Sequence, residues 1–248
     1  HRVIGGGEPL ICVPVVEQDA QSVIREITYL SQSTADMIEW RVDAFRDFTD
    51  YNAIRSVFEA VAPLLGEKLF LYTFRTAHQG GMAQVKAEQL DDLHDLAAES
   101  GCVDLVDLEF FEEDRPLHKI KRLREMGVSV IASHHDFEQT PSPEVMKMLL
   151  EKMCAGGADI VKLAVMPQNY KDVLNLLDVT AQFREENPDT PVITMSMGSL
   201  GGISRISGET FGSCVTFGAH EKPSAPGQFA MKELRQMLDT IHASSQIQ

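Results

Sequence analysis

A lysine stands inside an apolar run, where its chemistry would differ from that of a surface lysine. Lys162 lies in the run Asp159-Ile-Val-Lys-Leu-Ala-Val165. If this run is a strand, alternation places Ile160, Lys162 and Ala164 on one face. Burial disfavours the charged ammonium and lowers its pKa, and a neutral amine attacks carbonyl carbons. The run therefore predicts either a Schiff-base lysine or a buried lysine paired with a carboxylate of the fourth strand, which carries Asp107 and Glu109.

Two adjacent histidines end the preceding strand-like run, in the sequence His134-His135-Asp136. Successive strand residues point to opposite faces, so only one of the two histidines can face the same way as Lys162. A histidine beside an imine moves a proton at the carbon α to the carbonyl, whereas the alternative is ordinary hydrogen-bonded packing. Adjacent histidines do not readily bind one ion, and neither His-x-His nor His-Glu-x-x-His occurs. We therefore expect no metal and no cofactor.

Three arginines, Arg41, Arg75 and Arg205, follow other apolar runs of the chain. Brought together in an acidic protein, their guanidinium groups would suit a carboxylate or a phosphate. Each taken alone could instead form a surface ion pair. Glu39 shares a strand face with Arg41 and could accept a hydrogen bond from a substrate hydroxyl. Trp40, between them, points the other way and is expected in the core.

These side chains would meet if the apolar runs formed one parallel sheet. The runs are Leu10–Val16, Asp36–Val42, Lys68–Phe74, Val103–Phe110, Gly127–Ser133, Ala158–Val165, Pro191–Met197 and, more weakly, Phe211–Phe217. Near-continuous apolar runs of this length are typical of strands that are buried on both faces.

Amphipathic stretches separate the runs and predict helices. They are Ala20–Leu30, Asn52–Leu65, Val85–Ala98, Pro116–Met126, Pro143–Cys154, Tyr170–Glu186 and Gly227–Ile241. Asp19 is a candidate N-cap, Gly101 and Gly127 are candidate C-caps, and the link Gly198–Gly208 is only weakly helical. The serial alternation predicts an α/β fold, a single (β/α)8 TIM barrel over residues 1–248, with its site at the carboxyl ends of the strands. The alternative is a doubly wound open sheet, but no glycine-rich phosphate loop follows the first run.

Charge and composition narrow the classes of partner. The 248 residues include 22 Lys and Arg against 37 Asp and Glu, for a net charge of −15. This excess argues against non-specific nucleic-acid binding and against docking on anionic membranes. No apolar run approaches a spanning helix, and residues 1–7 hold no hydrophobic signal region. The four cysteines are scattered, without a Cys-x-x-Cys pair, as in reduced thiols of a cytoplasmic protein.

In their order and spacing, the motifs resemble those of the type I 3-dehydroquinate dehydratases of the shikimate pathway, a route to chorismate and the aromatic amino acids. The resemblance extends from the first strand to the last helix. The matching pieces are Glu39-x-Arg41, Thr73-Phe-Arg75 with Gly80-Gly81, Asp107-Leu-Glu109, Ser133-His-His-Asp-Phe137, Lys162, Ser196-Met-Gly198, Ser204-Arg205, Thr216-Phe-Gly218 and Ser224-Ala-Pro-Gly-Gln228.

The resemblance implies a lyase in which Lys162 condenses with the C3 ketone of 3-dehydroquinate. His135 would remove a C2 proton and then protonate the departing C1 hydroxyl, a syn elimination that gives 3-dehydroshikimate. His134 would be its dispensable, outward-facing neighbour. The substrate-binding positions are Arg205 and Gln228 for the carboxylate, and Glu39, Arg41, Arg75 and Ser224 for the ring hydroxyls. The resemblance also implies a homodimer, and the composition of Ala219–Gln228 favours a mobile lid.

One position departs from the family pattern Arg-x-x-x-Glu-Gly-Gly, because Gln79 stands four residues after Arg75. In the family, this glutamate contacts the catalytic histidine and helps to orient it or tune its proton affinity. Glutamine keeps the shape but loses the charge, so we expect attenuated catalysis. On this basis Gln79→Glu should raise kcat, while imine formation at Lys162 persists without it. Gln79 is either a natural variant or an introduced change, and the intact surrounding motif favours the second.

Two other functions stay open at this point. A class I aldolase-type barrel also uses a lysine of the sixth strand, but the segment Ser224–Gln228 and the position of His135 disfavour it. A non-catalytic barrel that senses a metabolite of the pathway is compatible with Gln79, and would bind the ligand without turnover even after Gln79→Glu.

Overall fold

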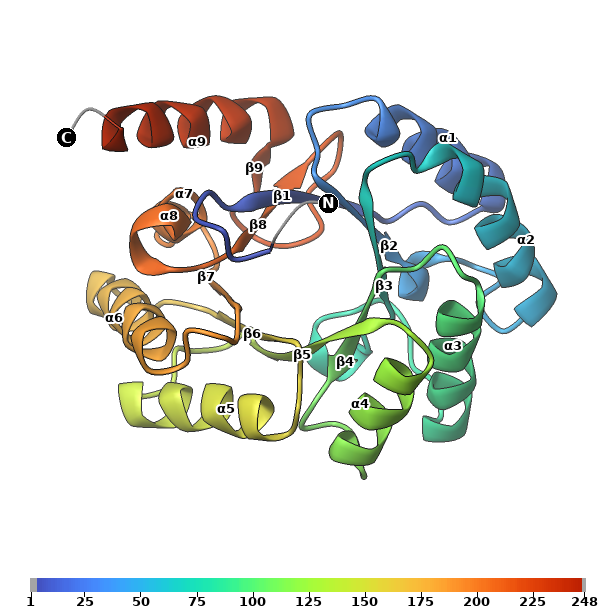
Figure 1. Cartoon of the computed structure of the whole chain (residues 1–248), viewed down its shortest axis with the longest axis horizontal. Coiled ribbons are helices and arrows are strands. Elements are labelled where there is room, and N and C mark those ends of the chain that lie inside the picture. The colour runs from blue at the N-terminus through green and yellow to red at the C-terminus, as the bar shows by residue number, and fades with distance from the viewer. Residues whose placement is uncertain (1–3, 247–248) are drawn as a thin grey trace.

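The computed structural model describes residues 4–246. Residues 1–3 lie outside this range, and they belong to the segment that we expect to lack a signal region. Its strands form a ring with the helices outside it (Figure 1). The strands are β1 Leu10–Val15, β2 Met37–Arg41, β3 Leu69–Thr73, β4 Leu105–Glu109, β5 Ser129–Asp136, β6 Ile160–Val165, β7 Val192–Ser196, β8 Val215–Ala219 and β9 Phe229–Ala230. The α-helices are α1 Ala20–Ser31, α2 Tyr51–Val61, α3 Ala87–Glu99, α4 Pro116–Glu125, α5 Pro143–Ala155, α6 Tyr170–Glu186, α7 Gly202–Ile206, α8 Gly208–Phe211 and α9 Met231–Ser245. The short 3-10 helices are η1 Val42–Ala44, η2 Ala62–Leu64 and η3 Ala77–Gln79.

The described strands form one sheet in the order β7-β6-β5-β4-β3-β2-β1-β8-β9, and the pairs are parallel. The first strand pairs with the eighth, with Leu10 opposite Val215. The ring of strands closes between β7 and β8, where Val192 of β7 forms a parallel bridge with Ser213, just before β8. This contact curls the sheet into a barrel, which confirms the predicted fold class.

The sheet separates two hydrophobic cores. Inside the barrel, Ile160 and Ala164 of β6 pack with side chains from the other strands, among them Phe217. Between strands and helices lies a larger core that includes Trp40. The predicted alternation along β6 and the core position of Trp40 are therefore both confirmed. Lys162 shares the inner face with Ile160 and Ala164, because side chains two residues apart point the same way.

Local sequence explains where the helices begin. Asp19 caps α1 by accepting a hydrogen bond from the backbone N–H of Ser22 at 2.9 Å, as predicted. Asn169 caps α6 through its side-chain oxygen in the same way. After α4, Gly127 adopts a φ of +97°, a left-handed conformation that suits glycine at a helix end.

Strand β5 ends at Asp136, as the sequence indicates, so both histidines lie within the strand. Several other boundaries differ from the sequence prediction. The predicted eighth strand began at Phe211, but β8 begins at Val215 because Gly208–Phe211 forms α8. The predicted last helix began at Gly227, whereas β9 precedes α9 there. Within residues 4–246, no helix combines the length and the apolar character that crossing a membrane requires.

Candidate active site

A pocket opens at the carboxyl ends of the strands, the end at which barrel enzymes carry their chemistry. Most of the predicted site residues line it. They are Glu39, Arg41, Arg75, Gln79, His135, Lys162, Ser224 and Gln228. The remaining predicted residue, Arg205, lies outside this lining.

Lys162 reaches this pocket from the barrel interior and is only 4% exposed. Its Nζ lies 3.7 Å from Oδ2 of Asp107 and 4.3 Å from the centre of the Phe217 ring. Burial lowers the pKa of Lys162 below its ordinary value of 10.5; Asp107 opposes this shift, and Arg75 adds to it. The alternative of an ion pair with a strand-four carboxylate is therefore present, but at a distance too long for a hydrogen bond.

Asp107 is held mainly by groups other than Lys162. Oδ2 of Asp107 lies 2.9 Å from Nη2 of Arg75, and its Oδ1 accepts a hydrogen bond from Ser133 at 2.6 Å. Arg75 also donates to Glu109 at 3.0 Å. Burial raises the pKa of Asp107, but Arg75 and Lys162 outweigh it and lower the pKa overall. A carboxylate held by Arg75 and Ser133 therefore stands 3.7 Å from the Lys162 amine.

His135 extends from β5 into the same pocket. Its ring stacks on Phe137, with ring centres 6.0 Å apart, and its Nδ1 is buried without a hydrogen-bond partner among the described residues. Burial lowers the pKa of His135 well below 6.5, and the positive charges of Arg75 and Lys162 add to this. The imidazole is therefore held neutral, in the form that accepts a proton. His134 packs edge-on against Phe111 instead and does not line the pocket.

Gln79 contacts His135 through the main chain rather than through the ring. Its Oε1 accepts the backbone N–H of His135 at 2.7 Å, and its Nε2 donates to Oε1 of Glu112 at 3.0 Å. Gln79 therefore contacts His135, and it also binds the carboxylate of Glu112.

Asp43 holds the polar side chains and backbone groups at the ends of β2 and β3. Arg41 donates through Nε and Nη2 to the two oxygens of Asp43, each at 2.8 Å. Asp43 also accepts the backbone N–H groups of Arg75 and Met82. Asp43 therefore ties the ends of two strands to the loop after η3, and it fixes the guanidinium of Arg41 at the pocket.

On the same side of the pocket, Glu39 accepts a hydrogen bond from the hydroxyl of Thr73 at 2.8 Å. On the opposite side, Ser224 and Gln228 bind each other twice. The Gln228 amide accepts the backbone N–H of Ser224 and donates to its hydroxyl. This pair organises the segment after β8 as a closed turn over the pocket.

Arg205 lies behind that turn and is 2% exposed. Its Nη2 donates to the carbonyl of Pro226 at 2.8 Å, and its Nε has no hydrogen-bond partner in residues 4–246. No Asp or Glu of the described chain lies within ion-pair distance of it. Burial lowers the pKa of Arg205 to about 10. A buried guanidinium in this state would gain from an added carboxylate.

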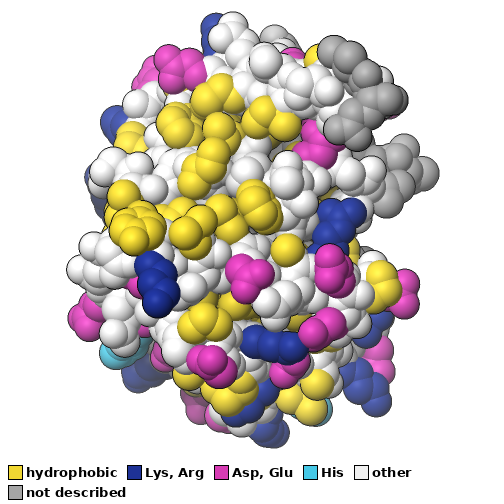
Figure 2. Space-filling view, turned by 90° about the vertical axis from the view of Figure 1, so that its left-hand side faces the viewer, with side chains coloured by type: hydrophobic (Ala, Val, Ile, Leu, Met, Phe, Trp, Pro, Cys, Tyr) yellow, Lys and Arg dark blue, Asp and Glu magenta, His cyan; other side chains and the backbone are white. Residues whose placement is uncertain are grey.

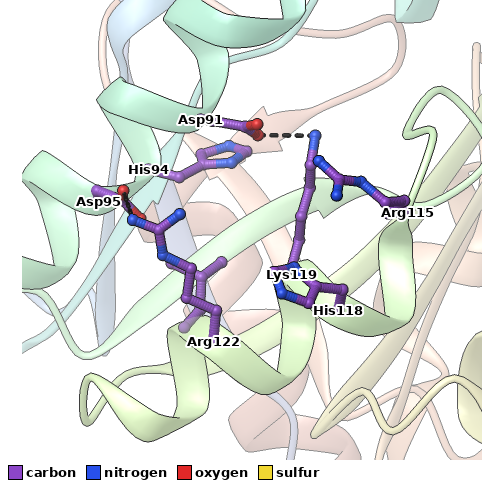
Figure 3. A pocket seen from close by; sticks show the side chains of 8 residues that line it. Asp91, His94, Asp95, Arg115, His118, Lys119 and Arg122 are labelled. Atoms are coloured by element: carbon purple, nitrogen blue, oxygen red, sulfur yellow. Dashed lines mark hydrogen bonds and ion pairs between the residues drawn. The ribbon is translucent and has the colours of Figure 1, made fainter.

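A second pocket, between α3 and α4, differs in its charge balance (Figure 3). Lys119 lies 2.7 Å from Asp91 and also pairs with Glu113. Burial lowers the pKa of Lys119, but these partners outweigh it and raise the pKa to about 12. Arg122 pairs with Asp95. Because acidic partners already hold these cations, this pocket offers much less to an anionic ligand than the barrel mouth does. In the part of the chain that the structure describes, no group of three His, Cys, Asp or Glu side chains could hold a metal ion.

Comparison with known proteins assigns the family. The family model described as type I 3-dehydroquinase matches residues 11–245. The chain belongs to the type I 3-dehydroquinase family. A 3-dehydroquinate dehydratase of Syntrophotalea carbinolica is 42% identical over 241 residues, which cover 97% of this chain and 95% of that protein.

Solved structures of the same family share the fold. The type I 3-dehydroquinate dehydratase of Clostridium difficile, with covalently modified comenic acid, matches with a TM-score of 0.93 and 39% identity, over 97% of this chain and 95% of that one. The 3-dehydroquinate dehydratase of Enterococcus faecalis matches with a TM-score of 0.88 and 35% identity, over 96% of each chain.

In this member of the type I 3-dehydroquinase family, the site also contains residues that the sequence analysis did not assign to it. Asp43 and Glu112 were missed because the pairing of Asp43 with Arg41 depends on the turn that both belong to, and because Gln79, the partner of Glu112, lies on another loop. Asp107 was foreseen only as one of two strand-four carboxylates that could pair with Lys162, and the sequence did not indicate which of Asp107 and Glu109 lies close to it. Met195 and Phe217, which line the pocket, carry no polar signal that separates them from core residues.

Proposed function

We propose that the chain converts 3-dehydroquinate to 3-dehydroshikimate through an imine on Lys162. The observation that carries this proposal is a buried lysine with a lowered pKa that shares one pocket with a neutral histidine. This arrangement provides a nucleophile for a ketone and a base for the proton α to it. The family model and the names of the relatives, 3-dehydroquinate dehydratases, support this substrate.

In the first step, Nζ of Lys162 attacks the C3 carbonyl, and the carbonyl oxygen leaves as water after one proton is taken up from the solvent. The product is a positively charged iminium, whose charge Asp107 would stabilise from 3.7 Å. A relative's structure contains covalently modified comenic acid, and this supports covalent chemistry within the fold.

In the second step, His135 removes a proton from C2, and the iminium accepts the electron pair as an enamine. The enamine then expels the C1 hydroxyl, which takes the proton from His135 and leaves as water. Hydrolysis of the imine consumes one water and regenerates Lys162. The net change is the loss of one water from the substrate.

Recognition of the anionic substrate would fall to the buried arginine behind the turn. The carboxylate would pair with Arg205, and the turn that carries Pro226 would shift to admit it, because the Pro226 carbonyl now occupies one guanidinium nitrogen. Gln228 would contribute an amide to the same group. Arg41, Arg75, Glu39 and Ser224 would hold the ring hydroxyls.

Borohydride reduction in the presence of 3-dehydroquinate tests this function. We expect a stable mass increase on the peptide that contains Lys162, and none in a Lys162→Met variant. Turnover is followed in parallel by the absorbance of the conjugated enone product. The proposal fails if no adduct forms and a chelator abolishes turnover.

We further propose that the chain forms a homodimer through an apolar patch over α5, α6 and α7 (Figure 2). The exposed apolar side chains of these elements and of the adjoining turn are Val145, Met148, Tyr170, Leu174, Leu200 and Ile203. Contiguous apolar surface of this kind marks protein contacts more often than solvent-facing surface.

A further inference from the structure

The loop after β4 carries a carboxylate that belongs to none of the roles described above. Glu112 is exposed, yet its Oε1 accepts a hydrogen bond from Nε2 of the buried Gln79 at 3.0 Å. The other end of the Gln79 amide accepts the backbone N–H of His135 at 2.7 Å. One amide therefore joins an acidic side chain to the backbone of the proposed acid–base residue.

These two partners select a single orientation of the Gln79 amide. An ionised carboxylate only accepts hydrogen bonds, and a backbone N–H only donates them. With the amide flipped, its oxygen would face the Glu112 carboxylate, and its NH2 group would face the N–H of His135. Glu112 thus holds the oxygen of Gln79 toward His135.

The backbone of His135 needs such a partner because the neighbouring strand has already ended. The pairing of β4 with β5 stops at Glu109 and Ser133. His135 lies two residues further, with its N–H directed toward the edge that β4 has left. Without Gln79 this donor would lose the acceptor that the structure gives it on that side.

The same short segment also supports the imidazole. A Cβ placed on Gly80 would come within 2.2 Å of the Phe137 ring, so Phe137 lies directly against this glycine. Phe137 in turn stacks on His135. Residues 79 and 80 therefore set both the backbone and the ring of His135.

We propose that Glu112 is a positioning residue, which locks the Gln79 amide and thereby places His135 for proton transfer. The kinetic part of this inference rests on the proposed function, whereas the structural part does not. It also changes the expectation drawn from the motif. With Glu112 present, Gln79→Glu brings two carboxylates to hydrogen-bonding distance, where like charges disfavour the ionised pair. Gln79→Glu should therefore help only where residue 112 is uncharged.

Hydrogen exchange of the His135 amide tests the structural part without any substrate. We expect Glu112→Ala to speed this exchange about threefold to tenfold, the factor that one net hydrogen bond represents. Glu138→Gln is the matched control, because this exposed carboxylate is close in sequence and makes no side-chain hydrogen bond or ion pair in residues 4–246. Unchanged exchange in Glu112→Ala would overturn the proposal.

A double-mutant cycle tests the kinetic part. We expect Gln79→Glu alone to lower kcat about tenfold and Glu112→Gln alone about threefold, each with little change in KM. The double variant should return to at least the kcat of the unmodified chain, because the amide introduced at position 112 can donate to the carboxylate introduced at position 79. If Gln79→Glu has the same effect in both backgrounds, Glu112 has no positioning role. If the unmodified chain shows neither turnover nor a borohydride adduct, the proposed function fails, while the exchange result stands.

Discussion

Nζ of Lys162 lies 3.7 Å from Oδ2 of Asp107, and Arg75 approaches the same oxygen more closely, at 2.9 Å. The carboxylate is therefore anchored by the arginine and available to the lysine. It can stabilise a cation that forms at Lys162 without holding the free amine in place. In the proposed mechanism, this arrangement would let the buried amine act first as a neutral nucleophile and then carry the charge of an iminium.

Replacing Asp107 with asparagine should separate these roles. The amide keeps the shape but removes the anion, so the iminium loses its counter-charge. We expect kcat to fall about 100-fold, the scale seen when one preorganised electrostatic partner is removed. Steady-state turnover measures this, with the exposed Asp189→Asn as the control and a thermal melt to verify folding. A kcat within a factor of about two of the unmodified enzyme would contradict the assigned role.

The pKa of His135 gives a second prediction. Burial, together with the positive charges of Arg75 and Lys162, lowers this pKa well below 6.5. The imidazole should therefore stay neutral at pH 6.5 and gain its proton only as the pH falls further. A carbon-13 titration of the ring in the free protein measures the midpoint. Lys162→Met removes a positive neighbour, which should move the midpoint upward. A midpoint at or above 6.5 in the unmodified chain would be incompatible with this account.

Removing Arg205 should weaken binding more than chemistry. Its guanidinium is buried without a carboxylate partner in the described residues, so a substrate carboxylate would supply the missing charge. We expect Arg205→Ala to raise KM about 10-fold to 100-fold, because this factor corresponds to the free energy that a hydrogen bond to a charged group contributes to binding. Arg205→Lys should recover part of this, and the exposed Arg55→Ala should leave KM unchanged. A loss confined to kcat would exclude carboxylate binding by Arg205.

The turn over the pocket should depend on Gly227. Its φ is +80°, and a Cβ there would lie 2.4 Å from the Gly198 carbonyl oxygen. Gly227→Ala should displace the turn, raise KM and increase protease cleavage within 219–228. Gly66→Ala is the matched control, since it imposes a positive φ with no atom close to the new Cβ. Equal cleavage in the two variants would argue against a lid, as would equal cleavage of the free and ligand-bound enzyme.

The apolar patch predicts the effect of a single charge on assembly. Leu174 on α6 is 57% exposed, as is Leu117 on α4, away from the patch. We expect Leu174→Glu to give a monomer in sedimentation velocity, because a charge at an interface core is strongly disfavoured. Leu117→Glu should keep the sedimentation coefficient of the unmodified chain. If that chain is itself a monomer, the dimer proposal is wrong.

The barrel could be predicted because its sequence signals are local. Each apolar run reports its own burial, and Lys162 is conspicuous because it interrupts such a run. The ends of elements were less predictable. Phe211 and Gly212 belong to an apolar run, but Gly212 adopts a φ of +111° at the end of α8, so the strand starts later. By contrast, β5 ends at Asp136 as predicted, and Asp136 pairs with β6 opposite Val165.

The network around the site was less accessible to sequence reasoning. Arg41 and Asp43 are close in sequence, but their bidentate pairing depends on the tight η1 turn between β2 and α2. Glu112 meets Gln79 across 33 positions, and no pattern in either segment indicates that contact. Arg205 was assigned by motif, yet its burial behind Pro226 follows from how the turn folds back over α7.

The contact between β7 and β8 is the place at which we expect the barrel to open most easily. Other neighbouring strands of the ring share ladders of several residues, whereas this pair meets at the Val192–Ser213 bridge, with the Ser213 hydroxyl accepting the N–H of Thr194. Local opening should begin where neighbouring strands share the fewest backbone contacts, so β7 and β8 should separate before the other strand pairs of the ring do. Arg205 lies on α7, which connects β7 to β8 and contacts both strands, while Lys162 and His135 lie on β6 and β5. A ligand that contacts both Lys162 and the turn after β8 would hold the two sides of this contact together. Its binding should therefore reduce the fluctuations that separate β7 from β8.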